Sequence, residues 1–417
     1  MAADLNQTPS ANRVHIGFFG KRNAGKSSLV NAVTGQSLSI VSDTKGTTTD
    51  PVQKAMELLP LGPVVIIDTP GIDDEGDLGQ LRVKRAKQAL RQCDIAVLVV
   101  DATRGLQPAD EDLITTFRKR DVPYVIAWNK ADLLSEAQLR EFDATAAAPD
   151  SAQGSTRAAQ IAVSALTGSN IYELKDLIGA FAAETGPKKR LVADLLEDGD
   201  VAVLVVPIDS SAPKGRLILP QQMTIRDILD SHVTCMVCQP DELAETLQAL
   251  ARPPKVVITD SQVFGQVAAV VPEGVWLTSF SILMARYKGS LEPFVRGAAK
   301  LSQLTDESHV LISEGCSHHR QCDDIGTYKI PKWIEGFAGA RPQFSFTSGG
   351  EFPESLEGID LVIHCGGCML NDKEMAHRVA TAVAANAPIV NYGIAIAQMH
   401  GILHRSLEPF PEVQELL

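Results

Sequence analysis

Gly20-Lys-Arg-Asn-Ala-Gly-Lys-Ser27 is the most informative stretch of this sequence. It follows an apolar run at 15–19, which predicts a strand, and it precedes a stretch with helical periodicity. In this context a glycine-rich loop binds phosphate, because its backbone N–H groups turn toward the phosphate oxygens and the next helix adds its positive end. On its own the pattern also fits a structural turn, so the downstream residues have to decide.

The polar residues of this loop have expected roles. Lys26 is expected to reach the β- and γ-phosphates of a nucleotide, and Ser27 is expected to give its hydroxyl to Mg²⁺. The residues expected to surround the nucleotide here are Gly20, Asn23, Ala24, Gly25, Lys26, Ser27 and Ser28. Asp68-Thr-Pro-Gly71 ends a second apolar run at 64–67, so Asp68 should lie near the metal and the Gly71 N–H near the γ-phosphate.

Two later motifs predict which base is bound. Asn129-Lys130-Ala-Asp132 follows an apolar run at 124–128, and the Asp132 carboxylate can accept hydrogen bonds from the N1–H and 2-amino groups of guanine. Adenine offers neither donor, and a buried carboxylate left unpaired costs about 1–3 kcal/mol. Ser164-Ala165-Leu166 resembles the loop whose backbone contacts the guanine oxygen. Four motifs in this order argue against a structural turn and predict GTP and Mg²⁺ as ligands.

A further segment, Gly46-Thr-Thr-Thr-Asp50, resembles the first switch of GTPases of the Era and MnmE type. We expect Thr48 to contact the γ-phosphate and Mg²⁺, with Thr47 and Thr49 as rivals. The expected catalytic residues are Lys26, Thr48, Asp68 and Gly71. Ile72 stands where Ras-like proteins position the attacking water with a glutamine, so hydrolysis should be slow.

Asn23 matches the asparagine that coordinates K⁺ in the MnmE-like group, where the cation takes the place of an arginine finger. This resemblance implies hydrolysis stimulated by K⁺. The alternative is a loop asparagine that hydrogen-bonds its own backbone.

Apolar runs alternate with helix-length stretches along the whole chain, which predicts an α/β fold with parallel sheets. The expected strands are 15–19, 64–67, 95–100, 124–128, 160–163, 201–206, 233–237, 256–259, 310–312, 361–363 and 388–390. The expected division is an N-terminal P-loop GTPase domain followed by two smaller α/β domains. Their bounds are 1–187, 188–268 and 269–417, with a Gly- and Pro-containing linker before the first boundary.

The composition limits the class of protein. A chain of 417 residues is too long for one core. Its net charge of −13 argues against broad contact with nucleic acid. No apolar window approaches the length of a membrane span, and the first residues lack the pattern of a secretory signal, so we expect a cytoplasmic protein. Seven cysteines, an odd set, favour metal binding or burial over disulfides.

Three of these cysteines follow expected strands. Cys316-Ser-His318 comes after the run at 310–312, and His364-Cys-Gly-Gly-Cys368 comes after the run at 361–363. In an open parallel sheet, ligands bind just beyond the carboxyl ends of strands. Three thiolates without a fourth cysteine in register fit an iron–sulfur cluster with one open position better than a closed zinc site.

Other interpretations of the cysteines and histidines stay open. A Cys-x-x-Cys pair alone also fits half of a zinc site or a redox pair. His318 and His364 are either cluster ligands or loop and supporting residues, and Cys322 is either a fourth ligand or a spectator. Cys235 and Cys238 also form a Cys-x-x-Cys pair, but inside an expected strand, where they should point to opposite faces and be buried, as should Cys93.

The union of a potassium-type GTPase with a Cys-x-His and a His-Cys-x-x-Cys motif resembles the HydF family, the GTPases that mature [FeFe]-hydrogenase. The resemblance implies a [4Fe–4S] cluster bound by Cys316, Cys365 and Cys368, with an exchangeable fourth site. It also implies a two-iron precursor received from the radical-SAM maturases HydE and HydG and passed to apo-hydrogenase. The middle domain would then make a homodimer.

Two functions from other classes compete with this one. An RNA- or ribosome-associated GTPase of the Era or MnmE kind is disfavoured by the acidic balance and by the lack of a basic C-terminal domain. A redox enzyme regulated by GTP would need a flavin, nicotinamide or SAM motif, and the sequence contains none that we recognise.

Overall fold

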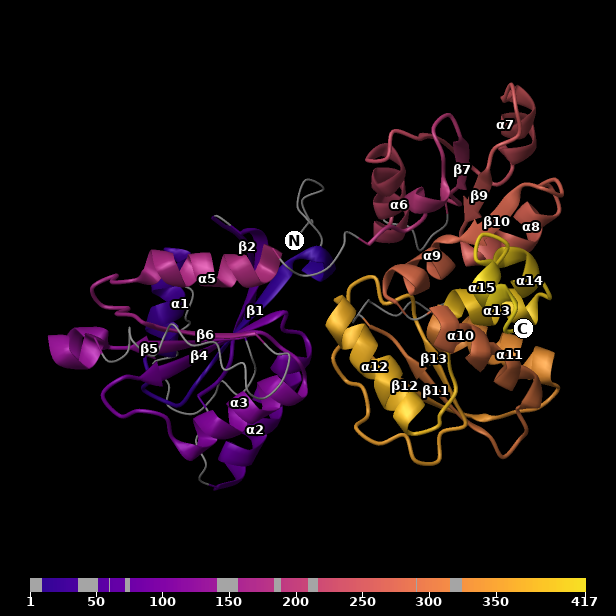
Figure 1. The fold of residues 1–417 in the computed structure, drawn as a ribbon. Coiled ribbons are helices and arrows are strands. Elements are labelled where there is room, and N and C mark those ends of the chain that lie inside the picture. Colours follow the sequence, from indigo (N-terminus) through magenta and orange to yellow (C-terminus); the bar gives the residue numbers. More distant parts are fainter. Residues whose placement is uncertain are drawn as a thin grey trace. The chain divides into compact units, whose positions relative to one another are not determined.

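The computed structural model describes residues 10–36, 52–59, 61–71, 76–140, 157–183, 189–208, 217–289, 291–315 and 325–417. The chain divides into two compact units, Met1–Pro187 and Lys188–Leu417 (Figure 1). Each unit is built of helices packed on parallel or mainly parallel sheets, so the protein has the expected α/β fold. Among the described residues no helix is both long and apolar enough to cross a membrane.

The first unit contains one six-stranded sheet with the order β2-β3-β1-β4-β5-β6, in which β2 is antiparallel to its neighbour and the other pairs are parallel. Its strands are β1 (Val14–Phe19), β2 (Val52–Leu58), β3 (Gly62–Asp68), β4 (Ile95–Asp101), β5 (Tyr124–Asn129) and β6 (Ala158–Ala162). Its helices are α1 (Lys26–Thr34), α2 (Gly76–Arg91), α3 (Pro108–Lys119) and α5 (Ile171–Ala183). Separate apolar cores form on the two faces of the sheet, which explains why β4 is buried along its whole length.

The second unit contains two four-stranded, fully parallel sheets with the orders β10-β9-β7-β8 and β12-β11-β13-β14. The strands are β7 (Val201–Val205), β8 (Thr234–Cys238), β9 (Val256–Thr259), β10 (Trp276–Ser279), β11 (His309–Ser313), β12 (Gln343–Thr347), β13 (Leu361–His364) and β14 (Ile389–Asn391). In the second sheet the chain places β8 on one side of β7 and β9 on the other. The third sheet repeats this order with β12 and β13 around β11, so the two sheets share one topology.

Helices connect and cover these strands (Figure 1). They are α6 (Leu219–Leu229), α7 (Leu243–Ala249), α8 (Phe264–Ala268), α9 (Phe280–Tyr287), α10 (Leu291–Ala298), α11 (Ile330–Ala338), α12 (Asp372–Ala384), α13 (Tyr392–Met399), α14 (Leu403–Ser406) and α15 (Pro411–Gln414). Short 3₁₀ turns occur at Ser10–Asn12, Ala131–Leu133, Ala193–Leu195, Ser261–Val263 and Ala299–Gln303, and a π-helical turn at Ile325–Lys329.

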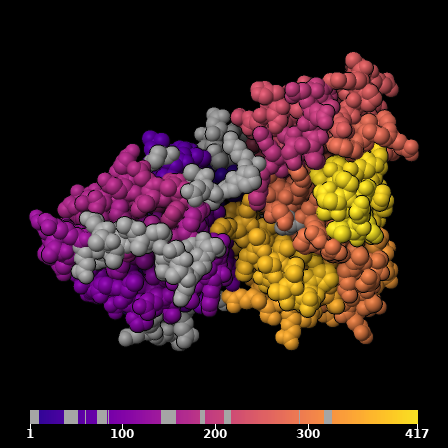
Figure 2. Space-filling model, viewed as in Figure 1, coloured from indigo at the N-terminus to yellow at the C-terminus, as the bar shows by residue number. Residues whose placement is uncertain are grey.

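One apolar core is shared by the two sheets of the second unit. It includes Leu204 of the second sheet and Val362 of the third. In Figure 2 the yellow C-terminal residues lie between the parts of the chain that form these two sheets. Arg405 of α14 fastens this segment by donating to the Pro272 carbonyl at 2.8 Å. The two sheets consequently pack as one body.

Within the described residues, eleven strands agree with the sequence prediction to within two or three residues at each end, and three were not predicted. The unpredicted strands are β2, β10 and β12. The side chains of β2 and β12 are largely exposed or half-buried, because both strands lie at sheet edges, so they produce no continuous apolar run. The expected boundary at 268 precedes β10, an edge strand of the second sheet, and the division of the second unit into domains stays a prediction.

Candidate functional site: a phosphate-binding loop and a cysteine loop at strand ends

The glycine-rich loop leaves β1 at the middle of the first sheet and leads into α1. Gly25 caps this helix with φ 85°, a left-handed conformation that glycine adopts without strain. A Cβ at Gly25 would collide with the side-chain amide of Asn129. Asn23 is also left-handed, with φ 65°. The loop therefore has the curled backbone that directs N–H groups inward, with the helix N-terminus behind it.

Three expected phosphate and magnesium residues meet beside this loop. Lys26 is buried, and its Nζ lies 2.5 Å from Asp68 Oδ1, while the Ser27 hydroxyl donates to Asp68 Oδ2 at 3.5 Å. Gly71 packs against the loop as well, since a Cβ there would lie 3.0 Å from the backbone of Arg22. A cation, a hydroxyl, a carboxylate and a glycine backbone at one point can bind a phosphate with its metal ion.

The two motifs expected to recognise guanine form one network with the loop. The Asn129 amide donates to the Ala24 carbonyl at 2.9 Å, and its oxygen accepts from the Ala165 N–H at 3.0 Å. Buried Ser164 donates its hydroxyl to Asp132 Oδ1 at 2.6 Å. Asn129 thus joins the loop to the 164–165 segment, and Ser164 orients the carboxylate predicted to read the base.

Asp101, at the end of β4, is a site residue that no motif indicated. Its Oδ2 lies 2.5 Å from the ammonium of Lys130. Burial favours a higher pKa for Asp101, but hydrogen bonds from Lys130 and Thr103 outweigh it and hold the pKa below its usual value. A single acidic residue at the end of an apolar strand carries no spacing signal, so the sequence alone could not find it.

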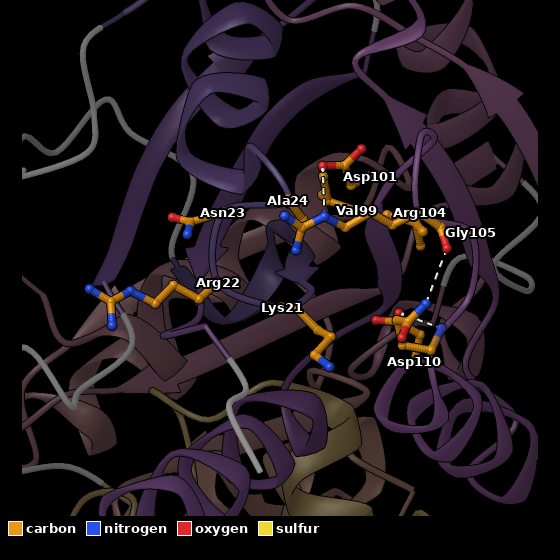
Figure 3. Close-up of a pocket in the computed structure, with 11 residues that line it drawn as sticks. Lys21, Arg22, Asn23, Ala24, Val99, Asp101, Arg104, Gly105 and Asp110 are labelled. Carbon is orange, nitrogen blue, oxygen red and sulfur yellow. Dashed lines mark hydrogen bonds and ion pairs between the residues drawn. The ribbon is translucent and has the colours of Figure 1, made fainter. Parts of the chain in front are cut away.

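A cavity of about 380 Å³ opens beside the phosphate-binding loop (Figure 3). The residues that line it are Lys21, Arg22, Asn23, Ala24, Val99, Val100, Asp101, Arg104, Gly105, Gln107 and Asp110. Figure 3 shows Arg104 interacting with Asp101, at 3.9 Å, while Arg22 points away from it. Neither Lys26 nor Asp132 lines the cavity, so it adjoins the predicted nucleotide site without coinciding with it.

Several predicted site residues lie outside the described part of the chain. They are Thr47, Thr48, Thr49, Ile72, Cys316, His318 and Cys322. Their roles stay predictions.

The cysteine loop follows β13, which lies beside β11 in the third sheet. The Gly315 N–H, just past the end of β11, donates to Cys365 Sγ at 3.0 Å, and the Gly367 N–H approaches the same sulfur at 3.4 Å. Gly315 directly precedes Cys316 in the chain. The point between β11 and β13 is where the strand order of this sheet reverses, the usual binding position in an open α/β sheet.

The surroundings of Cys368 favour a metal ligand over a redox thiol. Burial raises the pKa of the Cys368 thiol to about 11, and the neighbouring Cys365 adds to this, while the Lys288 cation opposes it. Reactive thiols of redox pairs have lowered pKa values instead. Among the described residues no three metal-binding side chains converge, and Cys365 and Cys368 are the two predicted ligands in view. Backbone N–H groups aimed at a cysteine sulfur are a feature of iron–sulfur sites, so these two residues fit such a group.

The predicted helix near Asn371 is present as α12. Asn371 caps it, because its side chain accepts from the Glu374 N–H at 3.0 Å. The helix N-terminus therefore begins a few residues after Cys368, where its positive end favours an anionic group.

His364 is fully buried, and both of its ring nitrogens bond within the protein. Nδ1 lies 2.7 Å from the Cys365 carbonyl, and Nε2 lies 3.0 Å from Nη1 of Arg378. A carbonyl only accepts and a guanidinium only donates, so Nδ1 carries the proton and Nε2 accepts. Arg378, itself buried, is paired with Glu374 at 3.0 Å. This arrangement makes His364 a support for the Cys365 backbone, and it leaves neither ring nitrogen available to a metal.

The remaining described cysteines behave as small buried residues. Cys235 and Cys238 both lie in β8, where Cys235 is opposite Ala202 and Cys238 is opposite Val205. They contact different apolar cores on the two faces of the sheet, as predicted, and cannot share a metal ion. Cys93 is buried in the first unit.

Comparison with known families divides the chain into three consecutive parts. The model described as "50S ribosome-binding GTPase" matches residues 15–130. The hydrogen maturase F dimerization domain matches residues 191–289, and the hydrogen maturase F tetramerization domain matches residues 292–409.

Individual relatives match the first part alone. GTPase Der of Kosmotoga olearia is 35% identical over 138 residues, which are 32% of this chain and 31% of that protein. The tRNA modification GTPase MnmE of Helicobacter pylori is 36% identical over 136 residues, which are 32% of this chain and 30% of that protein. The chain thus matches about a third of the length of these curated relatives.

Solved structures of GTPases also resemble the chain. A point variant of Era from Aquifex aeolicus bound to GDP·AlF₄⁻ is 21% identical, with 54% of this chain and 93% of that chain covered and a TM-score of 0.35. A probable GTP-binding protein engB is 24% identical, with 41% and 100% covered and a TM-score of 0.32. Both TM-scores are below 0.5, so these likenesses add nothing to the fold described above. Because a GTPase domain is followed in order by both hydrogen maturase F domains, which together span more than half of the residues, the chain belongs to the hydrogen maturase F (HydF) family.

Proposed function

We propose that this protein is a GTP-hydrolysing scaffold that accepts a two-iron precursor and delivers it to apo-[FeFe]-hydrogenase. The observation that carries the proposal is the 3.0 Å hydrogen bond from the Gly315 N–H to Cys365 Sγ. It joins the loop that leads to Cys316 with the loop that contains Cys365 and Cys368. The match of the same part of the chain to a hydrogen maturase F domain supports it.

In the nucleotide half, Lys26 would bind the β- and γ-phosphates, Ser27 and Thr48 would hold Mg²⁺, and Asp68 would support the metal from behind. The residues that would hold guanine are Asn129, Lys130, Asp132, Ser164 and Ala165. Slow hydrolysis is expected from Ile72, which has no group to orient water. Stimulation by K⁺ is expected from Asn23, which lies within the phosphate-binding loop.

The nucleotide half is tested by hydrolysis rates in K⁺ and in Na⁺. The protein should hydrolyse GTP but not ATP, and faster in K⁺, while Asn23→Ala should make the two salts equivalent. Equal rates in both salts for the unaltered protein would contradict the role of Asn23 and leave the scaffold function open.

In the cluster half, Cys316, Cys365 and Cys368 would hold a [4Fe–4S] cluster. When bound, the cluster supplies an iron with an exchangeable fourth position. The radical-SAM maturases HydE and HydG would supply the precursor, and the apo-hydrogenase would receive it, in the cytoplasm. Anaerobic reconstitution, iron analysis, EPR spectroscopy and activation of apo-hydrogenase test this half. A protein that takes up iron but never activates the hydrogenase would contradict the scaffold role.

A homodimer fits the second sheet. Its edge strand β8 leaves Val237 48% exposed, and the neighbouring Cys235 and Met236 are half-buried. An apolar edge strand is a template for pairing with another copy. Val237→Lys should shift the protein toward monomer in light scattering.

The second candidate function is an RNA- or ribosome-associated GTPase of the Era or MnmE kind. Der and MnmE match only the GTPase part, and the net charge of −13 gives little attraction to phosphates. Tight binding of RNA at physiological salt would favour this candidate over the scaffold.

A further inference from the structure

Lys288 is a buried lysine that touches the cysteine loop. It caps the C-terminus of α9, and its side chain has no exposed surface. Its Nζ donates to the Leu370 carbonyl at 2.7 Å and lies 3.0 Å from Asp372 Oδ1. Burying a cation is unfavourable unless partners compensate for its lost hydration. Both partners here come from the four residues that follow Cys368.

The two sides of this contact belong to different parts of the second unit. Lys288 follows β10 and α9, which extend the second sheet, whereas Leu370 and Asp372 join the cysteine loop to α12 of the third sheet. Lys189 also reaches Asp372, through the other carboxylate oxygen at 2.8 Å, but its side chain is 49% exposed. The same carboxylate therefore holds one buried and one exposed cation.

We propose that Lys288 is a positioning residue for the iron–sulfur cluster. It fixes the chain directly after Cys368 and keeps a positive charge beside the site where three thiolates and their cluster would carry negative charge. The contact with the Leu370 carbonyl restricts the Cys365–Cys368 turn from its C-terminal side, while His364 and Arg378 restrict it from the other. Charge and hydrogen bonding near the sulfurs set the potential of such a cluster. This inference rests on the proposed function for its cluster, but its structural part concerns the metal-free chain as well.

The structural part is tested by hydrogen exchange of the metal-free, full-length protein. Lys288→Met should raise exchange at the amides of 366–371 about tenfold or more, because a charged donor is lost from the loop. Lys189→Met is the matched control: it removes the exposed cation from the same carboxylate and should leave these amides unchanged. If Lys288→Met does not fold, Asp372→Asn should give a smaller increase in the same amides. Unchanged exchange, or equal changes in the Lys288 and Lys189 variants, would overturn the proposal.

The electrostatic part is tested by an EPR redox titration of the reconstituted protein. Loss of the buried cation disfavours the added electron, so Lys288→Met should lower the midpoint potential, and Lys189→Met should not. An unchanged potential in Lys288→Met would reduce Lys288 to a purely structural residue and overturn the proposal. If the unaltered protein binds no cluster, the proposed function fails, and hydrogen exchange still decides whether Lys288 holds the loop.

Discussion

Two Cys-x-x-Cys pairs occur in the second unit, and their surroundings differ completely. Cys235 and Cys238 lie within β8, so the period of the strand sends their side chains to opposite faces. Cys365 and Cys368 follow β13, where Gly367 takes φ 62° and turns the chain. The same spacing therefore gives two packing residues in a strand and two adjacent thiols in a turn. Spacing alone does not make a metal site; the backbone that carries it does.

The two sheets that carry these pairs repeat the comparison on a larger scale. Both have the same strand order, so both have a reversal point between their first and third strands. In the second sheet the strands at this point lead to Val206 and Asp260, whereas in the third they lead to Gly315 and Cys365. Topology provides the position, and the residues that follow the strands determine whether it holds a site.

The largest expected effect separates the two cysteine pairs. Cys365→Ser should abolish cluster binding and hydrogenase maturation, because iron loses a strong thiolate ligand. GTP hydrolysis should persist, since the nucleotide motifs lie in the other unit. Iron analysis and EPR after anaerobic reconstitution measure this, with Cys235→Ser as the control that should load normally. Full iron loading of the Cys365 variant would return a zinc site or a redox pair to consideration.

The second expected effect is the converse. Lys26→Ala removes the ammonium group that pairs with Asp68, and it should lower the rate of GTP hydrolysis by roughly 10²-fold or more. The EPR signal of the cluster should remain. A phosphate-release assay on the same reconstituted sample measures both properties. Loss of the cluster signal would mean that the two units are not independent.

The third effect tests whether the turn, and not the cysteines alone, makes the site. Gly367→Val places a β-branched residue at φ 62°, with a strain of about 1–3 kcal/mol, and its Cβ would collide with the methyl group of Met375. Iron retention against a chelator should fall. Gly339→Val is the control, because Gly339 has φ 67° with open space around it and caps α11. Equal iron retention in both variants would show that the turn is dispensable.

Motifs carried the prediction where chemistry fixes residue types at fixed spacing. The loop at 20–27, the guanine motif and the cysteine loop all lie at strand ends as expected, and α12 begins where predicted. Edge strands such as β12 were missed because half-exposed residues give no apolar run. Lys288 and Arg378 were missed for another reason. A buried cation is recognised by partners far away in sequence, and a single lysine or arginine in a helix usually indicates an exposed surface.

The smallest effect distinguishes the two cysteines of β8 from each other. Cys238 is 8% exposed and packs among Val205, Val257 and Phe264, so a serine hydroxyl there would lose hydration. Cys238→Ser should lower the free energy of unfolding by about 1 kcal/mol. Cys235→Ser, on the half-buried face, should lower it by about 0.5 kcal/mol or less, the usual range for sites near the surface. Urea denaturation of the two variants measures the difference. Equal losses would mean that both side chains lie in equally dry surroundings, for instance because the edge strand is covered by a second copy of the chain, and dilution to monomer should then restore the difference.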